Sequence, residues 1–306
     1  MRFMQFARLR ARLIGLAGAA AAALSFTSAA QAQYVMMPDS TNDRIVLFSP
    51  VDGSLVNSNY FGINDGTTPV HAMQVGSEIW VSEQLGDSIS RYSLTGSPLG
   101  TITGGLDNVR GMGLIGGSVY VTNSGTNNGA PGNAVIEFDT AGNNLGSFST
   151  VGLAPSPFGI LEYQGGMLVS SSSANDDIHE FSLAGGSLGT FHNSASLNFA
   201  EQMDYAADGN ILVAGFSTNN VVKLDANTGA LISSFAASGA RGVYQLGNGN
   251  ILWTSGSGTF VFDTATGGTT QVYAGGGRYL DNLVIPEPGS AALLGAAGLL
   301  ALRRRR

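Results

Sequence analysis

Residues 210–235 read NILVAGFSTNNVVKLDANTGALISSF. In this stretch an apolar run is followed by a polar loop, a run of alternating polarity, a Gly-containing turn and a short final run. The pattern predicts three successive β-strands. Similar stretches begin at Tyr34, Glu78, Ser118, Gly166 and Asn250. The chain therefore consists largely of six copies of one β-rich unit.

The spacing of the copies indicates how they are arranged. The equivalent apolar residues are Val35, Ile79, Val119, Met167, Ile211 and Ile251, which lie 44, 40, 48, 44 and 40 residues apart. A four-stranded unit of this length is typical of one β-propeller blade. A long β-solenoid is the main alternative, but its repeats would be shorter and more uniform. We therefore predict an all-β fold, a six-bladed propeller of four-stranded blades over residues 33–285.

A short innermost strand precedes five of the copies. These segments are HAMQV from His71, RGMGL from Arg110, FGILE from Phe158, EQMDY from Glu201 and RGVYQ from Arg241. The first copy lacks one, but RYLDNLVI at residues 278–285 is left over at the other end. We expect it to complete the first blade, so that N-terminal and C-terminal strands pair and no sheet edge stays open. The blade pattern over residues 34–285 is similar to NHL-type six-bladed propellers.

The first residues of the inner strands form the candidate ligand site. They are His71, Arg110, Phe158, Glu201, Arg241 and Arg278. Residues 34–285 contain six Lys or Arg in 252 positions, so three arginines in this set exceed chance. We expect them to surround one channel mouth and bind an anionic or hydroxyl-rich ligand, with bidentate Arg contacts and stacking on Phe158. Alternatively, the arginines pair with Glu201, Asp204 or Asp281 and fill the channel.

The sequence predicts no catalytic residue, no metal site and no cofactor. Calcium at the loop around Asn175 is the alternative to no cofactor, but the spacing of a calcium-binding loop is missing there. His71, His179 and His192 share no metal-ligand spacing, and His179 is expected to face solvent. The alternative function is an extracytoplasmic enzyme resembling metal-dependent propeller lactonases or lyases. Three arginines would repel a divalent cation, so a binding function is favoured.

Residues 1–32 have the three regions of a secretory signal peptide. Arginines extend to Arg12, an apolar run covers residues 13–26, and Ala30 and Ala32 form an A-x-A cleavage site. We expect signal peptidase to leave a mature chain that begins at Gln33. A membrane anchor is the alternative, but the run is shorter than the roughly 20 residues of a membrane span. The chain has no cysteine, so an exported domain would have no disulfide support.

The C-terminal segment, residues 286–306, contains a Pro-Glu-Pro motif, a short apolar run and a basic tail. The residues that carry the pattern are Pro286, Glu287, Pro288, Arg303, Arg304, Arg305 and Arg306. The segment resembles the PEP-CTERM sorting signal of Gram-negative bacteria. This resemblance implies cleavage by an exosortase, transient membrane contact before processing, and a destination at the cell surface or in the extracellular matrix, together with exopolysaccharide. An ordinary C-terminal anchor would not explain Pro-Glu-Pro.

Charge narrows the possible partners. Without the four arginines near each end, six basic residues face 21 acidic ones, a net charge of −15. Such a chain is repelled by phosphate backbones, so we expect no nucleic-acid partner. The sequence thus predicts an exported propeller that is a non-enzymatic binding or structural platform, with a glycan or a secreted protein as its partner.

Overall fold

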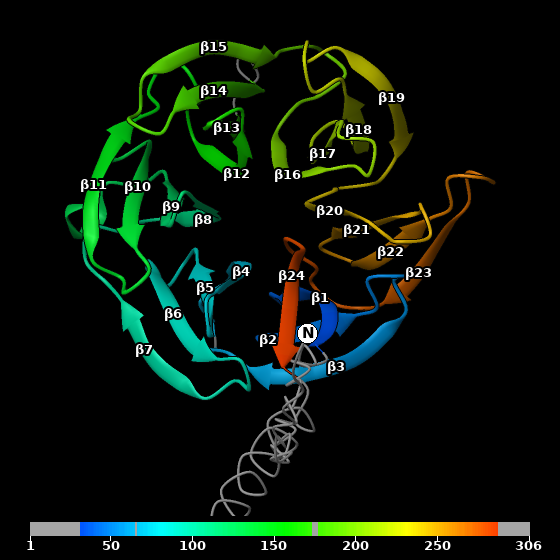
Figure 1. Ribbon diagram of the computed structural model, residues 1–306, viewed down its shortest axis with the longest axis horizontal. Helices are drawn as coiled ribbons and strands as arrows, with labels where there is room; N and C mark the ends of the chain where they lie inside the picture. The colour runs from blue at the N-terminus through cyan, green and yellow to red at the C-terminus, as the bar shows by residue number, and fades with distance from the viewer. Residues whose placement is uncertain (1–30, 65, 173–176, 287–306) are drawn as a thin grey trace, which may run out of the picture. The chain divides into compact units, whose positions relative to one another are not determined.

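The computed structural model describes residues 31–64, 66–172 and 177–286. These residues form a ring of six antiparallel four-stranded sheets, the β-propeller that the repeat predicts (Figure 1). In this part of the chain the helical element is a single 3₁₀ turn, η1 (Asn127–Gly129). None of its helices is long and apolar enough to cross a membrane.

Each sheet is one blade, and its strands run from the centre of the ring to the outside (Figure 1). Blade 1 contains β24 (Asp281–Pro286), β1 (Gln31–Asp39), β2 (Arg44–Phe48) and β3 (Leu55–Gly62), and blade 2 contains β4 (Pro69–Val75), β5 (Glu78–Glu83), β6 (Ser88–Ser93) and β7 (Pro98–Ile102). Blade 3 contains β8 (Val109–Ile115), β9 (Ser118–Asn123), β10 (Ala134–Asp139) and β11 (Asn144–Ser149), and blade 4 contains β12 (Pro157–Tyr163), β13 (Gly166–Ser171), β14 (Ile178–Ser182) and β15 (Ser187–His192). Blade 5 contains β16 (Ala200–Tyr205), β17 (Ile211–Gly215), β18 (Asn220–Leu224) and β19 (Leu231–Ala236), and blade 6 contains β20 (Gly242–Gln245), β21 (Ile251–Ser255), β22 (Gly258–Phe262) and β23 (Thr269–Tyr273).

The hydrophobic core lies between the blades. Second strands such as β17 are buried along their whole length, which explains the continuous apolar runs, whereas outer strands such as β7 are mostly exposed. Each pair of neighbouring blades shares one apolar cluster of described residues. In one of them Trp80 of blade 2 packs with Phe138 of blade 3. The ring is therefore stabilised by contacts between repeats, as expected for stacked units that cannot bury their faces alone.

Blade 1 is closed by the two ends of the propeller, as predicted. Strand β24 pairs with β1 in antiparallel register from Gln31↔Pro286 to Met36↔Asp281. The pairing begins two residues before the predicted boundary at Gln33 and ends one residue after Ile285. Ala32 thus lies in β1 and Pro286 in β24. The rest of the two predicted signals, including Ala30, Glu287, Pro288 and Arg303 to Arg306, lies outside the described residues.

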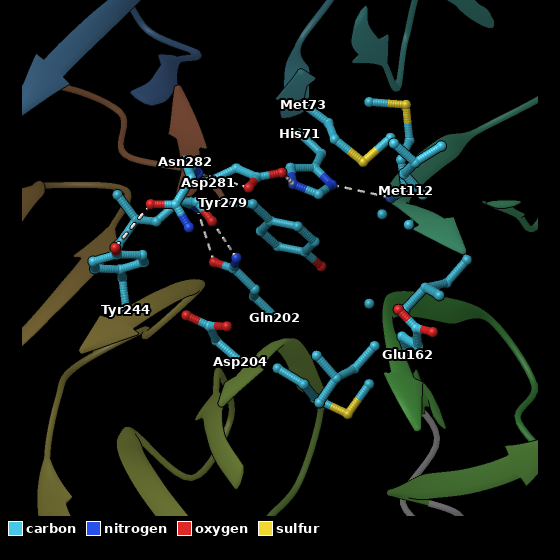
Figure 2. Close-up of a pocket in the computed structure, with 18 of the residues that line it drawn as sticks. His71, Met73, Met112, Glu162, Gln202, Asp204, Tyr244, Tyr279, Asp281 and Asn282 are labelled. Carbon is cyan, nitrogen blue, oxygen red and sulfur yellow. Dashed lines mark hydrogen bonds and ion pairs between the residues drawn. The ribbon is translucent and has the colours of Figure 1, made fainter. Parts of the chain in front are cut away.

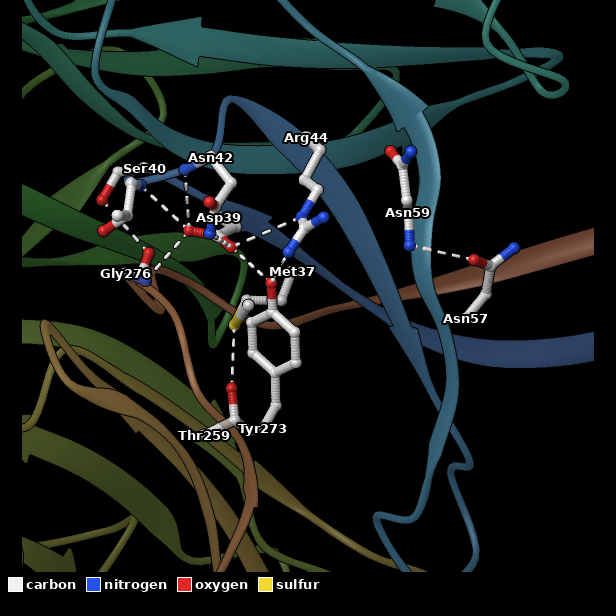
Figure 3. Close-up of polar contacts among 11 residues, drawn as sticks. Met37, Asp39, Ser40, Asn42, Arg44, Asn57, Asn59, Thr259, Tyr273 and Gly276 are labelled. Atoms are coloured by element: carbon white, nitrogen blue, oxygen red, sulfur yellow. Dashed lines mark hydrogen bonds and ion pairs between the residues drawn. The ribbon is translucent and has the colours of Figure 1, made fainter.

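A buried carboxylate reinforces the closure where blade 6 meets blade 1 (Figure 3). Asp39 is fully buried and accepts hydrogen bonds from the Tyr273 hydroxyl, the Asn42 amide and the backbone N–H groups of Thr41 and Gly276. Burial by itself would raise the pKa of Asp39, but these hydrogen bonds outweigh it and lower the pKa. The network ties the end of β1 to β23 and to the segment before β24.

Candidate functional site

The inner strands meet through a repeated hydrogen bond near their starts. Hydroxyls on the second strands of blades 2, 3, 4 and 6 donate to a carbonyl of the next blade. The pairs are Ser82 with Arg110, Thr122 with Phe158, Ser170 with Glu201 and Thr254 with Arg278. In blades 5 and 1 a backbone N–H serves instead, from Gln202 to Arg241 and from Tyr279 to Val70. We count positions along each inner strand and the residues just before it from the residue that carries this carbonyl, which we call the first position.

One of the six predicted residues is misplaced by one position. Val70, and not His71, occupies the first position in β4, because the Val70 carbonyl accepts the bond from the preceding blade. The N–H of His71 accordingly bonds to the Ser82 hydroxyl, as the N–H of Gly159 does to Ser170. A sequence signal existed: Val70, Arg110 and Phe158 each lie twelve residues before the repeated hydroxyl. His71 lies only eleven residues before Ser82, so the same spacing excludes it from the first position.

The other five residues do come together. Glu201 interacts electrostatically with Arg110, Arg241 and Arg278, and the Arg110 guanidinium lies 3.8 Å from the Phe158 ring centroid. We call these five residues the arginine cluster. Its members come from five different blades, so the ring geometry brings them near one another.

Arg110 is held by structural contacts. Its guanidinium donates to the Ser156 hydroxyl at 2.9 Å and to the Pro157 carbonyl at 3.1 Å, and it stacks on Phe158. The residue is 6% exposed, and burial lowers its pKa to about 10. Arg110 thus remains a cation at neutral pH, but few of its donors are free for a ligand.

The guanidinium groups of Arg241 and Arg278 make fewer hydrogen bonds than that of Arg110. Arg278 donates from Nε to the Ser40 hydroxyl at 3.0 Å, and burial together with nearby Arg241 lowers its pKa to about 10. Arg241 lies 5.1 Å from the Phe216 ring centroid, and its Nε is buried without a hydrogen-bond partner. Within the described residues, neither guanidinium lies within 4 Å of a carboxylate. The alternative prediction was that Glu201, Asp204 or Asp281 neutralises the arginines. No direct ion pair of Arg241 or Arg278 with these carboxylates supports it in the described part of the chain.

Glu201 is the carboxylate of the cluster. It is 2% exposed, and burial raises its pKa to about 7 although Arg241, Arg278 and Arg110 all act in the opposite direction. Its Oε2 and the hydroxyl of Tyr279 are buried without hydrogen-bond partners. The cluster thus holds three cations against one carboxyl group that is partly protonated at neutral pH.

A pocket of about 260 Å³ opens further along the inner strands (Figure 2). Of the six predicted residues, His71 lines it and the other five do not. The polar lining comes chiefly from Gln202, Asp204, Tyr244, Asp281 and Asn282, and the apolar lining includes Met73, Met112, Met203 and Leu280. We call this the channel pocket. The sequence analysis named Asp204 and Asp281 only as possible partners of the arginines, because it followed the first position of each strand, whereas these two residues and Tyr244 occupy the fourth.

Gln202 and His71 tie neighbouring blades together inside the channel. The Gln202 side chain accepts from the N–H groups of Val243 and Leu280, at 3.0 and 2.9 Å. His71 Nδ1 accepts from the Met112 N–H at 3.0 Å, so this nitrogen carries no proton. His71 Nε2 then lies 3.3 Å from Asp281 Oδ2.

Two further observations concern metals and histidines. Among residues 31–64, 66–172 and 177–286, no group of three or more His, Asp or Glu side chains could hold a metal ion. Asn175 lies outside these residues. The expectation that His179 faces solvent is wrong: it is 4% exposed, contacts Phe181 and lies 2.8 Å from the Ser187 hydroxyl. The outer strand β15 covers it.

No family model and no curated protein matches this sequence. Several solved structures have a fold similar to that of this chain. A protein of unknown function from Bacteroides caccae is 15% identical, with a TM-score of 0.63 over 83% of this chain and 99% of that one. A chain in the crystal structure of a nidogen/laminin complex is 14% identical, with a TM-score of 0.68 over 82% and 98%.

A functionally unknown protein from Desulfotomaculum acetoxidans DSM 771 is also similar, at 14% identity and a TM-score of 0.52 over 79% of each chain. The chain is thus similar to these proteins as a six-bladed β-propeller. At such low identity the likeness concerns the fold alone, because one propeller architecture carries many unrelated functions.

Proposed function

We propose that this chain is an exported β-propeller that binds an anionic group at its arginine cluster and acts as a non-enzymatic platform at the cell surface or in the extracellular matrix. The observation that carries the proposal is the state of the Arg241 guanidinium, which makes no side-chain hydrogen bond or ion pair within the described residues and lies near Arg278. Two neighbouring cations disfavour each other, and Glu201, whose pKa burial raises to about 7, offsets their charges only in part, so a bound carboxylate would relieve the repulsion.

An acidic sugar is the ligand class that this chemistry fits. Guanidinium groups bind planar carboxylates through paired hydrogen bonds, and Phe158 and Phe216 lie against Arg110 and Arg241. The strongly negative remainder of the chain would repel nonspecific polyanions, so binding depends on this local cluster. The signal-peptide pattern and the Pro-Glu-Pro tail support export into a glycan-rich setting.

The first test removes Arg241 and Arg278, the two arginines whose guanidinium groups make the fewest hydrogen bonds in the cluster. In the Arg241→Ala, Arg278→Ala double variant, we expect galacturonic acid to bind at least about tenfold more weakly, because both bidentate donors are lost. Isothermal titration calorimetry measures the affinity, and galactose serves as the uncharged ligand control. Lys223→Ala, which removes a cation paired with Asp208 elsewhere on the propeller, should leave binding unchanged. Equal binding of galactose, or unchanged binding in the double variant, would contradict the proposal.

The second test concerns sorting. Replacing Glu287 by Ala in the native host should leave the unprocessed protein held at the membrane, because the proposed sorting signal depends on Pro-Glu-Pro. Cell fractionation followed by mass measurement of the chain detects this. Ser290→Ala, just beyond the motif, is the matched control and should be processed normally. Normal release of the Glu287 variant would remove the basis for the sorting assignment.

A further inference from the structure

The channel pocket is an acidic site with an apolar interior. Three carboxylates line it, from Glu162, Asp204 and Asp281, and none of its lining residues is Lys or Arg. Figure 2 shows Asp204 and Asp281 near the Gln202 side chain, with Met73 and Met112 on the neighbouring inner strands. Its volume of about 260 Å³ is close to the lower end of ligand pockets, roughly 300–1,000 Å³. A small molecule therefore fits it better than a polymer.

The carboxylates of this pocket have no cationic partner of their own. Asp204 Oδ1 accepts from the neighbouring N–H of Tyr205 at 2.8 Å, and no ion pair involves Asp204 in the described part of the chain. Burial raises the pKa of Asp204 to about 7, and the nearby charge of Asp281 adds to this. Asp204 is thus a carboxylate that a bound cation would stabilise.

His71 does not supply the missing charge. Its Nδ1 accepts the Met112 N–H, so a second ring proton would break a bond that joins blades 2 and 3. The ring, 6% exposed, turns Nε2 toward Asp281 Oδ2 at 3.3 Å, where it orients this carboxylate. No Lys or Arg of the pocket lining lies beside Asp281 to compete with a ligand.

The nonpolar lining indicates what kind of cation fits. Thioethers of Met73, Met112 and Met203 are soft, adaptable surfaces for an apolar body, and the rings of Tyr244 and Tyr279 add aromatic surface. A hydrated metal ion would gain nothing from them, and no three-carboxylate or histidine metal cluster exists among the described residues. We propose that the channel pocket binds a small organic amine, with its ammonium group between Asp204 and Asp281 and its apolar body against the methionines.

This site is independent of the proposed anion site. It begins one position further along the inner strands of five blades and at Tyr244 in blade 6, shares no residue with the arginine cluster, and attracts the opposite charge. Failure of an acidic sugar to bind would leave the amine proposal untouched, and the reverse also holds.

The test uses two probes of nearly the same shape. We expect 2-phenylethylamine to bind the propeller in isothermal titration calorimetry at about pH 8, where it is a cation, and 2-phenylethanol to bind at least about tenfold more weakly. Asp204→Asn and Asp281→Asn should each weaken amine binding about tenfold or more, because each removes one carboxylate charge. Asp52→Asn, in the exposed β2–β3 turn, removes the same charge elsewhere and should change nothing.

The proposal is overturned if the alcohol binds as well as the amine, which would indicate a site for apolar or hydroxyl-rich ligands. It is also overturned if Asp204→Asn and Asp281→Asn bind the amine like the unaltered protein, or if the unaltered protein binds neither probe. Thermal unfolding of each variant shows that it is folded, and neither Asn substitution changes side-chain volume appreciably.

Discussion

Replacing Leu283 by Asp is expected to unfold the propeller. Leu283 is fully buried in β24, pairs with Tyr34 of β1, and packs in the cluster that joins blades 1 and 2. The substitution removes apolar contacts with Met36 and Ile79 and buries a carboxylate with no partner. Changes of this kind cost more than about 4 kcal/mol, a large part of the roughly 5–15 kcal/mol that stabilises a protein.

Urea unfolding followed by circular dichroism measures this effect. Leu283→Ala should be intermediate, with a loss of about 2–5 kcal/mol from the cavity it leaves. Asn282→Asp, at the exposed neighbouring position, retains an oxygen that can accept the Tyr244 hydroxyl and should be nearly neutral. If Leu283→Asp unfolds at the urea concentration of the unaltered protein, β24 does not hold the ring closed.

Replacing Glu201 by Gln is expected to stabilise the propeller at high pH. Burial raises the pKa of Glu201 from 4.5 to about 7, so the folded state prefers the protonated group. The stability from this preference is fully present below pH 4.5 and is lost as the pH rises through about 7. Gln cannot ionise, so the variant should exceed the unaltered protein by about 3 kcal/mol at about pH 8.

The free energy of unfolding, measured at about pH 4 and about pH 8, tests this sign. The difference between Glu201→Gln and the unaltered protein should be near zero at the lower pH. Glu162→Gln, at an exposed position on β12, should stay within about 0.5 kcal/mol at both. A Glu201→Gln variant that is less stable at high pH would mean that attraction to Arg241, Arg278 and Arg110 outweighs the burial of the charge.

The comparison of the two candidate sites shows where sequence reasoning reached its limit. The repeat brought Arg110, Phe158, Glu201, Arg241 and Arg278 to equivalent positions, and the structure places them together. His71 was assigned to the same set because HAMQV resembles RGMGL, with Met73 matched to Met112. In the structure Ala72 pairs with Val81 as Met112 pairs with Val121, which moves His71 into the channel pocket.

The channel pocket escaped detection for a related reason. Register irregularities interrupt the inner strands near their starts, for example between Val109 and Met112 and between Ala200 and Met203. Side chains do not simply alternate between the two faces of a sheet at such bulges. The face on which Asp204 or Asp281 lies could therefore not be worked out by counting residues from the start of the strand. The repeat pattern also does not indicate that His71 Nδ1 accepts a hydrogen bond from the Met112 N–H of the next blade.

The sequence by itself determined the number of blades, the strands in each and the closure by both ends, because every repeat must bury its apolar faces against its neighbours. It also determined the residue at the first position, the one whose carbonyl bonds to the preceding blade, in five of the six blades. Tertiary structure alone decided which of these side chains have partners, since Arg241 and Glu201 come from different blades. Burial, charge balance and the channel pocket depend on distances across the ring, and no spacing along the chain encodes those distances.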